Sequence, residues 1–253
     1  MNNKYIFLVT SYNCRPYIDG CITSLLMQND RDFGVIFIDD ASTDGTVDRI
    51  NEFLRGVDLD YKIHVNEKRT RSAAWNQYQA VIKHVKNPNS KIMILDADDT
   101  LYDNNAFDRI KKAETFSPFI STKYEAGVLD YEGSITRVGV PSPMYRINEP
   151  YHLRYFNAWL YKAVPESMYY RDSKLMGAGS DLAFIYPVID LLDKKFNICN
   201  FLVYKWNNHL KNHNDHFLRL DEQRSNCDYI KNREKMSPLT QEQIQEIKDN
   251  WNT

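Results

Sequence analysis

The sequence predicts an α/β fold in which a mostly parallel sheet is flanked by helices. Apolar runs at residues 5–9, 35–38 and 92–95 are continuous rather than alternating, which is typical of strands buried on both faces. The segments between them carry apolar residues at helical spacing. Strands that alternate with helices form a parallel sheet with right-handed crossovers. A chain of 253 residues can bury such a core without disulfides or metals.

The first two strands are separated by a helix whose apolar stripe runs from Ile18 to Leu26. The second strand ends in an acidic pair, and Ser42 or Asp44 is expected to cap the helix that follows. A short strand at 61–65 comes next. The third helix has an apolar face that should contain Ala74, Tyr78, Val81, Ile82 and Val85.

The second half of the chain is less regular. Residues 103–149 predict a short helix followed by strand and turn pieces, and residues 150–164 are compatible with an amphipathic helix. A helix should begin near Asp181, and Pro187 should kink it. The tail looks helical, with a capping box from Thr240 to Gln243. We expect one domain over 1–216, with a regular half (1–100) and a less regular half (101–216). Residues 217–253 should form a C-terminal helical extension.

Composition excludes several classes of protein. The 32 basic and 34 acidic residues give a net charge of −2, which argues against binding nucleic acid through bulk electrostatics. The sequence contains no run of about 18 apolar residues, so it predicts no membrane-spanning helix. The N-terminal apolar stretch is too short for a secretory signal. The four cysteines are scattered, which favours free thiols in a reducing compartment. We therefore expect a cytoplasmic protein, in the host cytoplasm if the protein is viral.

Acidic residues end two of the buried strands. Asp39-Asp40 follows the second strand, and Asp96-Ala97-Asp98-Asp99 follows the strand at 92–95. Ligands of parallel α/β sheets bind beyond the carboxyl ends of the strands. Charge at this position is costly unless it meets a cation or hydrogen-bond donors, and carboxylates are ligands that Mg²⁺ and Mn²⁺ prefer. The pattern favours a cation site over a solvated acidic turn.

Two enzyme families share this local pattern. Asp96-Ala97-Asp98-Asp99-Thr100-Leu101 resembles the first motif of haloacid-dehalogenase-type phosphatases, in which Asp96 would be the nucleophile. In that family the motif normally opens the domain, whereas three strand–helix units precede it here. A later acidic pair at a strand end, which that family also needs, is not evident in the sequence.

The second resemblance covers nearly the whole chain. Residues 9–13, the stretch Asp39-Asp40-Ala41-Ser42-Thr43-Asp44-Gly45-Thr46, and residues 95–99 resemble family 2 glycosyltransferases of the GT-A fold. Residues 66–69 and 73–76 resemble the segment between the third strand and its helix in that family. The family usually has a glycine there, and Arg71 or Ser72 stands in its place.

Three later segments resemble a subset of the same family. Residues 151–156 are similar to its His-Leu-Arg-x-Phe segment, and Asn214-Asp215-His216 is similar to its Asn-Asp-His segment. Residues 179–183, followed by Tyr186-Pro187, resemble the segment that carries the catalytic base. Asp181 is therefore the expected general base, and a plain helix cap is its alternative role.

The resemblance implies an inverting glycosyltransferase that uses a nucleotide sugar, with uridine diphosphate (UDP) as the expected nucleotide. The expected cofactor is Mn²⁺ or Mg²⁺. Residues 1–100 would then form the nucleotide-sugar-binding half of the domain, and residues 101–216 the acceptor and catalytic half. Asp98 and His216, or His213 instead of His216, would hold the metal. The acceptor would be a glycan or, as the lesser alternative, a modified DNA base. A nucleotide-sugar-binding protein without activity is the rival class. The expected donor-binding residues are Thr10, Tyr12, Asn13, Asp39, Asp40, Arg69, Asn76, Asp96 and Ala97, and the expected acceptor residues are His152, Arg154 and Tyr155.

Overall fold

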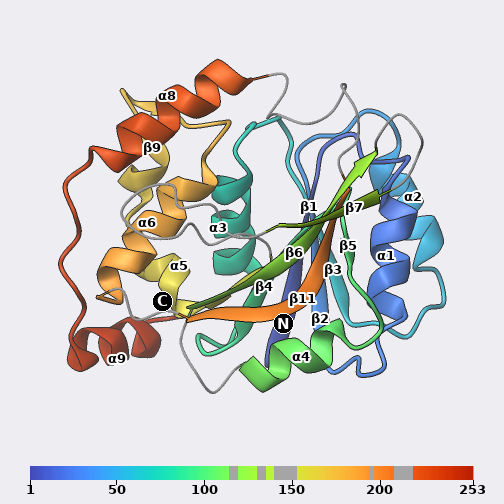
Figure 1. Ribbon diagram of the computed structural model, residues 1–253. Coiled ribbons are helices and arrows are strands. Elements are labelled where there is room, and N and C mark those ends of the chain that lie inside the picture. Colours follow the sequence, from blue (N-terminus) through green and yellow to red (C-terminus); the bar gives the residue numbers. More distant parts are fainter. Residues whose placement is uncertain (114–118, 130–134, 140–152, 194–196, 208–218, 253) are drawn as a thin grey trace.

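The computed structural model describes residues 1–113, 119–129, 135–139, 153–193, 197–207 and 219–252. The chain forms an α/β fold with a mixed, mostly parallel sheet flanked by helices (Figure 1). This arrangement confirms the predicted fold class. Within the described residues the strands run in the order β3-β2-β1-β4-β8-β6-β11-β5, with β7 paired to β6.

The first four strands are parallel neighbours, as predicted. The register places Ser11 beside Asp39 and Thr10 beside Asp96, so the acidic strand ends lie at one edge of the sheet. Strand β3 pairs with β2 at the outer edge. The bounds are β1 (Tyr5–Ser11), β2 (Gly34–Asp39), β3 (Tyr61–Val65) and β4 (Lys91–Asp96).

Helices cover both faces of this half of the sheet (Figure 1). In β1, Ile6 and Leu8 belong to one buried cluster, whereas Phe7 and Val9 belong to the other. Alternate side chains of one strand thus enter two apolar layers, which explains the continuous apolar runs. The first layer contains residues of α3 (Ala73–His84), α5 (Trp159–Ala163) and α6 (Asp181–Leu191), and the second contains residues of α1 (Ile18–Leu26), α2 (Thr46–Phe53) and α4 (Ala106–Ala113).

The remaining strands extend the sheet beyond β4. Strand β8 (Arg154–Asn157) pairs antiparallel with β4 and β6, so this part of the 150–164 segment is a strand rather than the expected helix. Pairing with two neighbours satisfies its backbone groups, which the side-chain pattern alone did not reveal. The other strands are β5 (Thr100–Leu101), β6 (Phe119–Leu129), β7 (Ile135–Gly139) and β11 (Asn197–Asn207).

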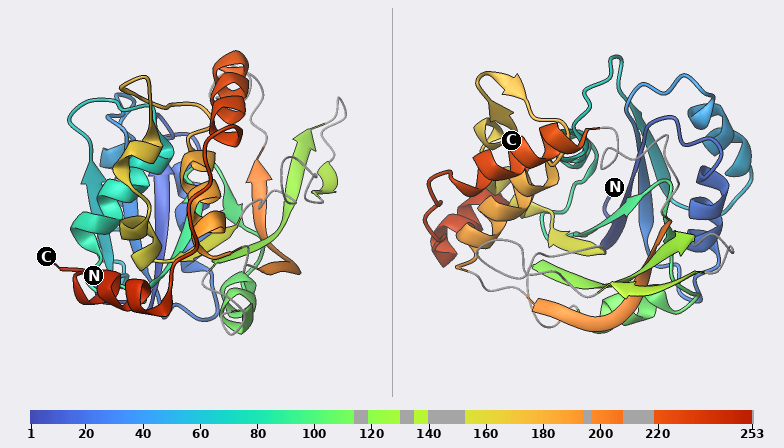
Figure 2. Two further views of the ribbon diagram at one scale, coloured as in Figure 1. Left: turned by 90° about the vertical axis from the view of Figure 1, so that its left-hand side faces the viewer. Right: turned by 45° about the horizontal axis from the view of Figure 1, so that its top comes forward.

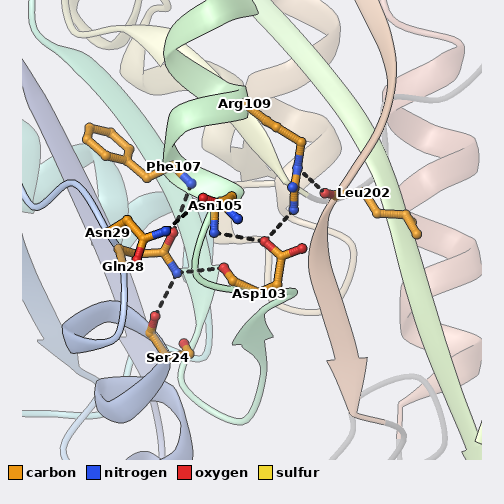
Figure 3. Close-up of polar contacts among 8 residues, drawn as sticks. All are labelled: Ser24, Gln28, Asn29, Asp103, Asn105, Phe107, Arg109 and Leu202. Carbon is orange, nitrogen blue, oxygen red and sulfur yellow. Dashed lines mark hydrogen bonds and ion pairs between the residues drawn. The ribbon is translucent and has the colours of Figure 1, made fainter.

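A buried amide ties α1 to α4. Gln28 is 5% exposed, and its Nε2 donates to the carbonyls of Ser24 and Asp103 at 2.9 and 2.8 Å (Figure 3). Its Oε1 accepts from the backbone N–H of Phe107 at 3.0 Å. Nearby, Arg109 joins α4 to β11 through the carbonyl of Leu202. Polar bonds thus position α4 against both its neighbours.

The C-terminal residues form helices that pack on the core. The predicted capping box is present, with Thr240 Oγ1 accepting from Gln243 N and Gln243 Oε1 accepting from Thr240 N. Trp251 donates from Nε1 to the carbonyl of Val85 at 3.1 Å. The predicted boundary at 216/217 lies outside the described residues. The helices are α8 (Leu220–Lys231) and α9 (Gln241–Asp249), preceded along the chain by the short helix η1 (Glu166–Tyr169) and the hairpin of β9 (Tyr170–Arg171) and β10 (Lys174–Leu175).

Three further observations bear on the sequence predictions. Cys14, Cys21 and Cys227 carry free thiols. Among the described helices, none has the length and apolar character that crossing a bilayer requires. In α3, Ile82 is 40% exposed instead of buried, because the helix turns Ala74, Ala80 and Val81 toward the sheet.

Candidate active site

The turn after β4 holds three carboxylates beside the end of β1. Thr10 Oγ1 donates to Asp96 Oδ1 at 2.9 Å, and Ala97 N donates to the carbonyl of Thr10 at 2.9 Å. Asp99 N closes the turn on the carbonyl of Asp96 at 3.0 Å. Asp96 and Asp98 remain partly exposed, whereas Ala97 and Asp99 are buried. The two partly exposed carboxylates are therefore the ones that a ligand can reach.

The end of β11 braces this turn from the other side. The hydroxyl of Tyr204 donates to Asp99 Oδ2 and lies 3.5 Å from Asp96 Oδ2. Asn207 donates from its backbone N–H to Asp99 Oδ1 at 2.7 Å and from Nδ2 to the carbonyl of Asp98 at 2.9 Å. Neither Tyr204 nor Asn207 is among the residues that the sequence predicts for the site. They lie more than 100 positions from their partners, and no local pattern marks them.

The electrostatics of the turn suit a cation. Burial, and then the charges of Asp98 and Asp96, raise the pKa of the Asp99 carboxyl well above its usual value. Burial raises the pKa of the Cys14 thiol, and the charge of Asp98 adds to that effect. Negative charge gathered in one turn is costly, and a bound cation would offset it.

The described residues do not by themselves complete a metal cage, since no three His, Cys, Asp or Glu side chains among them converge as a ligand set. Magnesium and manganese are commonly held by one or two carboxylates together with substrate phosphates, so Asp98 with Asp96 beside it fits such an ion. The predicted metal ligand His216 and its alternative His213 lie outside the described residues, as does His152.

Asp39 is enclosed at the end of β2. Its side chain is 0% exposed, and its Oδ1 accepts from the hydroxyls of Ser11 at 3.1 Å and Ser42 at 2.5 Å. Its Oδ2 accepts from the backbone N–H of Ser42 at 2.8 Å. The structure therefore shows Asp39 joining the β1 and β2 loops.

Asp40 anchors the loop between β3 and α3. Its Oδ1 accepts from Asn66 Nδ2 and Thr70 N, both at 2.8 Å, and its Oδ2 accepts from Arg71 N at 2.8 Å. Burial opposes ionisation, but the hydrogen bonds from Thr70, Asn66 and Arg71 outweigh it, so the pKa of Asp40 is lowered. Asn76 is buried in α3, and its Oδ1 accepts from Asn66 and from Thr70. Asp40 and Asn76, both predicted to bind the donor substrate, thus belong to one hydrogen-bond network.

The same loop explains the unusual residue at the position of the family's glycine. Arg71 has φ +62°, in the left-handed region that favours glycine. Its backbone N–H bond to Asp40 holds it there. The chain therefore keeps the loop conformation without the glycine.

Tyr12, in the loop after β1, is in contact with Arg69, in the loop between β3 and α3. The Arg69 guanidinium carbon lies 3.4 Å from the centre of the Tyr12 ring, and Arg69 is exposed. Asn13 has φ +51°, its N–H donates to Ser42 Oγ at 2.8 Å, and its Oδ1 accepts from Thr43 N at 2.9 Å. Asn13 thereby fixes the loop that presents Tyr12 to the guanidinium.

Asp181 begins α6 and pairs with Arg154 of β8. Arg154 Nη2 lies 3.0 Å from Asp181 Oδ2, with the Arg154 side chain 11% exposed and that of Asp181 40% exposed. Arg154 stands opposite Ile94 in the β4–β8 pairing. Ile94 precedes Asp96 by two residues, or about 7 Å along a strand. The ion pair therefore places Asp181 on the same side of the molecule as the acidic turn.

Tyr155, the remaining acceptor prediction that the structure describes, does not lie with Arg154. Its ring is 1% exposed and belongs to the apolar layer that contains Phe7. Adjacent residues of a strand point to opposite faces, so Tyr155 and Arg154 cannot share a surface. The structure joins Thr10 to Asp96 and Arg154 to Asp181, with Thr10 and Arg154 on the two strands that pair with β4, and it leaves Tyr155 in the core.

An α/β fold with an acidic turn after the fourth parallel strand and loops gathered at the same edge defines the GT-A class of glycosyltransferases. The model of "Glycosyl transferase family 2" matches residues 6–162, more than half of the chain. The chain belongs to this family.

A teichoic acid poly(glycerol phosphate) polymerase of Staphylococcus epidermidis is 34% identical over 100 residues, which is 39% of this chain. The chain spans only 13% of the length of that relative.

Solved structures show the same fold. S. aureus TarS (residues 1–349) in complex with UDP-GlcNAc aligns with a TM-score of 0.59 at 20% identity, covering 84% of this chain and 60% of the other. The mannosyltransferase PcManGT of Pyrobaculum calidifontis, in complex with GDP-Man and Mn²⁺, aligns at 0.61 and 15% identity, covering 93% and 66%. Glucosyl-3-phosphoglycerate synthase of Mycobacterium tuberculosis, in complex with Mn²⁺, UDP and phosphoglyceric acid, aligns at 0.60 and 11%, covering 91% and 79%.

Proposed function

We propose that the protein is a metal-dependent, inverting glycosyltransferase that moves a sugar from a UDP-sugar to an acceptor hydroxyl. The observation that carries the proposal is the Arg154–Asp181 pair, which sets a partly exposed carboxylate beside the strand whose end bears Asp96 and Asp98. A leaving-group site and a base at the same end of the sheet are what such a transfer requires. Family membership supports the reaction class.

The donor site is formed by the two loops and the acidic turn. Asp98, with His216 or alternatively His213 from outside the described residues, would hold Mn²⁺ or Mg²⁺. The bound ion would neutralise the leaving diphosphate. Asp96, already bonded to Thr10, would accept from the ribose. Arg69 would add positive charge near the diphosphate while its Tyr12 partner lines the base pocket.

The uracil contact is assigned to Asp40 rather than Asp39. Asp40 is 7% exposed, whereas Asp39 is fully enclosed by the two serines. The N3–H of a pyrimidine is the natural donor to such a carboxylate. The Asn66, Thr70 and Asn76 network would hold Asp40 in place, and Asn13 would shape the adjoining wall.

Asp181 would act as the general base. It would take the proton of the acceptor hydroxyl as the acceptor oxygen attacks the anomeric carbon, and the bond to the diphosphate oxygen would break with its electron pair on the departing UDP. Asp181 is the first residue of α6, and its partly exposed carboxylate is paired with Arg154. A base that faces the leaving group across the sugar inverts the anomeric configuration.

The acceptor is proposed to be a glycan hydroxyl. Arg154, and His152 from outside the described residues, would line its side of the cleft. The relative that aligns over 100 residues is a teichoic acid polymerase, which is consistent with a surface-polymer acceptor. A modified DNA base is the lesser alternative, and it would require affinity for DNA that falls steeply with salt. Among the described residues, no contact favours the phosphatase alternative with Asp96 as nucleophile.

The test is the Asp181→Asn variant, assayed with a panel of UDP-sugars. We expect UDP affinity in the presence of Mn²⁺ to be unchanged, because the donor loops do not contact Asp181, and we expect turnover to fall by about 10²–10⁴-fold because the base is lost.

Asp193→Asn is the matched control, since Asp193 is exposed and follows the end of the same helix. Full turnover of Asp181→Asn would show that Asp181 is not the general base and only begins helix α6. UDP binding with no turnover of the wild type on any sugar would instead favour a binding protein.

A further inference from the structure

The segment that leads into Asp181 has almost no side-chain volume. It reads Gly177-Ala178-Gly179-Ser180, and Gly179 has φ +76°, which a residue with a side chain adopts only with strain. Two bonds close the segment as a turn, Ser180 N to Gly177 O at 3.0 Å and Leu182 N to Gly179 O at 3.3 Å. The segment that precedes the first turn of α6 thus has too little side-chain volume to hold its own backbone in place.

Helix α8 packs against α6, the helix that this segment precedes (Figure 2). A Cβ placed on Gly177 would lie 2.2 Å from Arg219 Nη2 and 2.8 Å from Glu222 Oε1. A Cβ placed on Gly179 would lie 3.1 Å from Cys227 Sγ. These three residues of the C-terminal extension recur at helical spacing and occupy the space that the glycines leave.

A buried hydrogen bond completes the contact. Asn226 is 6% exposed, and its Nδ2 donates to the carbonyl of Ala178 at 2.9 Å. The Arg219 guanidinium is held over Gly177 by two bonds to Glu222. The carbonyl of Arg71, in the loop anchored on Asp40, lies 3.0 Å from the same Cβ position. The segment therefore meets both α8 and that loop.

We propose that Asn226 is a positioning residue for the base, and that the C-terminal helix α8 is thereby part of the active-site architecture. Arg154 holds the Asp181 carboxylate at its tip, while Asn226, through Ala178, holds the backbone on which Asp181 stands. Misplacement of a reacting group by about 1 Å costs on the order of 10²-fold in rate. This inference rests on the proposed function, because it concerns the same Asp181.

The experiment compares transfer kinetics of the wild type with Asn226→Ala, Asn226→Asp and Asn232→Ala. Asn226→Ala should lower kcat about tenfold, which corresponds to about 1.4 kcal/mol. KM for the donor and the affinity for UDP with Mn²⁺ should stay within twofold, since Asn226 makes no contact with the donor loops. Asn226→Asp keeps the side-chain volume but replaces the hydrogen-bond donor with an acceptor. It should therefore also lower kcat and leave KM and the UDP affinity within twofold.

Asn232→Ala is the matched control. Asn232 also donates from Nδ2 to a backbone carbonyl, that of Asp228 at 2.9 Å, but it is exposed and lies at the far end of α8. Its kcat should equal that of the wild type. Melting temperatures of all variants identify any that fail to fold, and the isosteric Asn226→Asp is then the deciding variant.

The outcomes separate this inference from the proposed function. Wild-type kcat in a folded Asn226 variant overturns the positioning role, as does a parallel loss of kcat and UDP affinity, which indicates general destabilisation. If Asp181→Asn loses turnover while the Asn226 variants keep it, only this inference fails. If Asp181→Asn keeps turnover, the proposed base and this inference both fall.

Discussion

At the scale of single residues, the acidic turn separates one buried carboxyl group from two partly exposed ones. Asp99 is buried and accepts from Tyr204 and Asn207, whereas Asp96 and Asp98 are partly exposed. Partners that orient the residues around a metal are often worth as much as the ligands themselves. We therefore expect the turn to depend on Tyr204 even though its hydroxyl is buried.

The Tyr204→Phe variant should weaken the joint affinity for Mn²⁺ and UDP by about tenfold, because the loss of the hydroxyl releases Asp99 and, with it, the geometry of Asp98. Calorimetric titration of Mn²⁺ in the presence of UDP measures this. Tyr161→Phe is the control, since the Tyr161 hydroxyl is buried without a hydrogen-bond partner in the described part of the chain. Unchanged Mn²⁺ affinity of Tyr204→Phe would contradict the bracing role.

At the scale of elements, α1 and α4 are joined by a buried amide rather than by apolar contact alone. Gln28 satisfies a backbone carbonyl and a backbone N–H of the segment that leads into α4. A buried polar group that loses its partner costs about 1–3 kcal/mol.

Gln28→Leu should therefore lower the free energy of unfolding by about 2–4 kcal/mol, because Asp103 O and Phe107 N lose their partner together. Urea denaturation measures the change. Asn29→Ala is the control, since the exposed Asn29 bonds only the Asn105 side chain in Figure 3 and should shift stability by about 0.5 kcal/mol or less. Equal effects of the two substitutions would show that burial of Gln28 does not decide its contribution.

The contact of β3 with α3 makes stability depend on pH. His64 Nδ1 lies 3.1 Å from His84 Nε2, and burial, followed by the charges of His64 and Lys83, lowers the pKa of His84 from 6.5 to about 4. The unfolded chain thus binds the proton more readily than the folded chain between pH 6.5 and 4. Stability from this pair is complete above pH 6.5 and is lost as the pH falls toward 4.

We expect the wild type to lose about 1–2 kcal/mol more than His84→Gln between pH 7 and pH 4.5, a value below the full linkage because both rings are partly exposed. Urea denaturation across this range gives the two slopes. Parallel pH profiles of the two proteins would exclude the pair as the source.

At the scale of the whole molecule, the proposed donor site is assembled from segments that are far apart in the sequence. The end of β1 meets the acidic turn because β1 pairs with β4, and the end of β11 contacts the same turn through Tyr204 and Asn207. A ligand that joins these segments should stabilise the entire fold by mass action.

UDP should therefore raise the melting temperature only when Mn²⁺ or Mg²⁺ is present. At 100 times the dissociation constant the gain is about 2.7 kcal/mol, or about 5–10 °C for a chain of this size. Thermal denaturation with UDP alone, metal alone and both together measures it. An equal shift with UDP alone would show that the nucleotide binds without the ion.

The sequence by itself determined the parallel half of the sheet, the acidic turn at its edge and the capping box at Thr240. Each of these is local, since a doubly buried strand is read from consecutive residues and a cap from four positions. The family resemblance also singled out both Arg154 and Asp181, but it assigned them to different tasks.

Only the tertiary structure decided which of these residues touch. That Arg154 faces Asp181 while Tyr155 turns into the core follows from the alternation of β8, a strand that the sequence suggested was helical. Tyr204, Asn207 and Asn226 bond to partners 48 to 109 positions away. Such contacts depend on strand order and on the docking of α8, which long-range packing sets and no local pattern encodes.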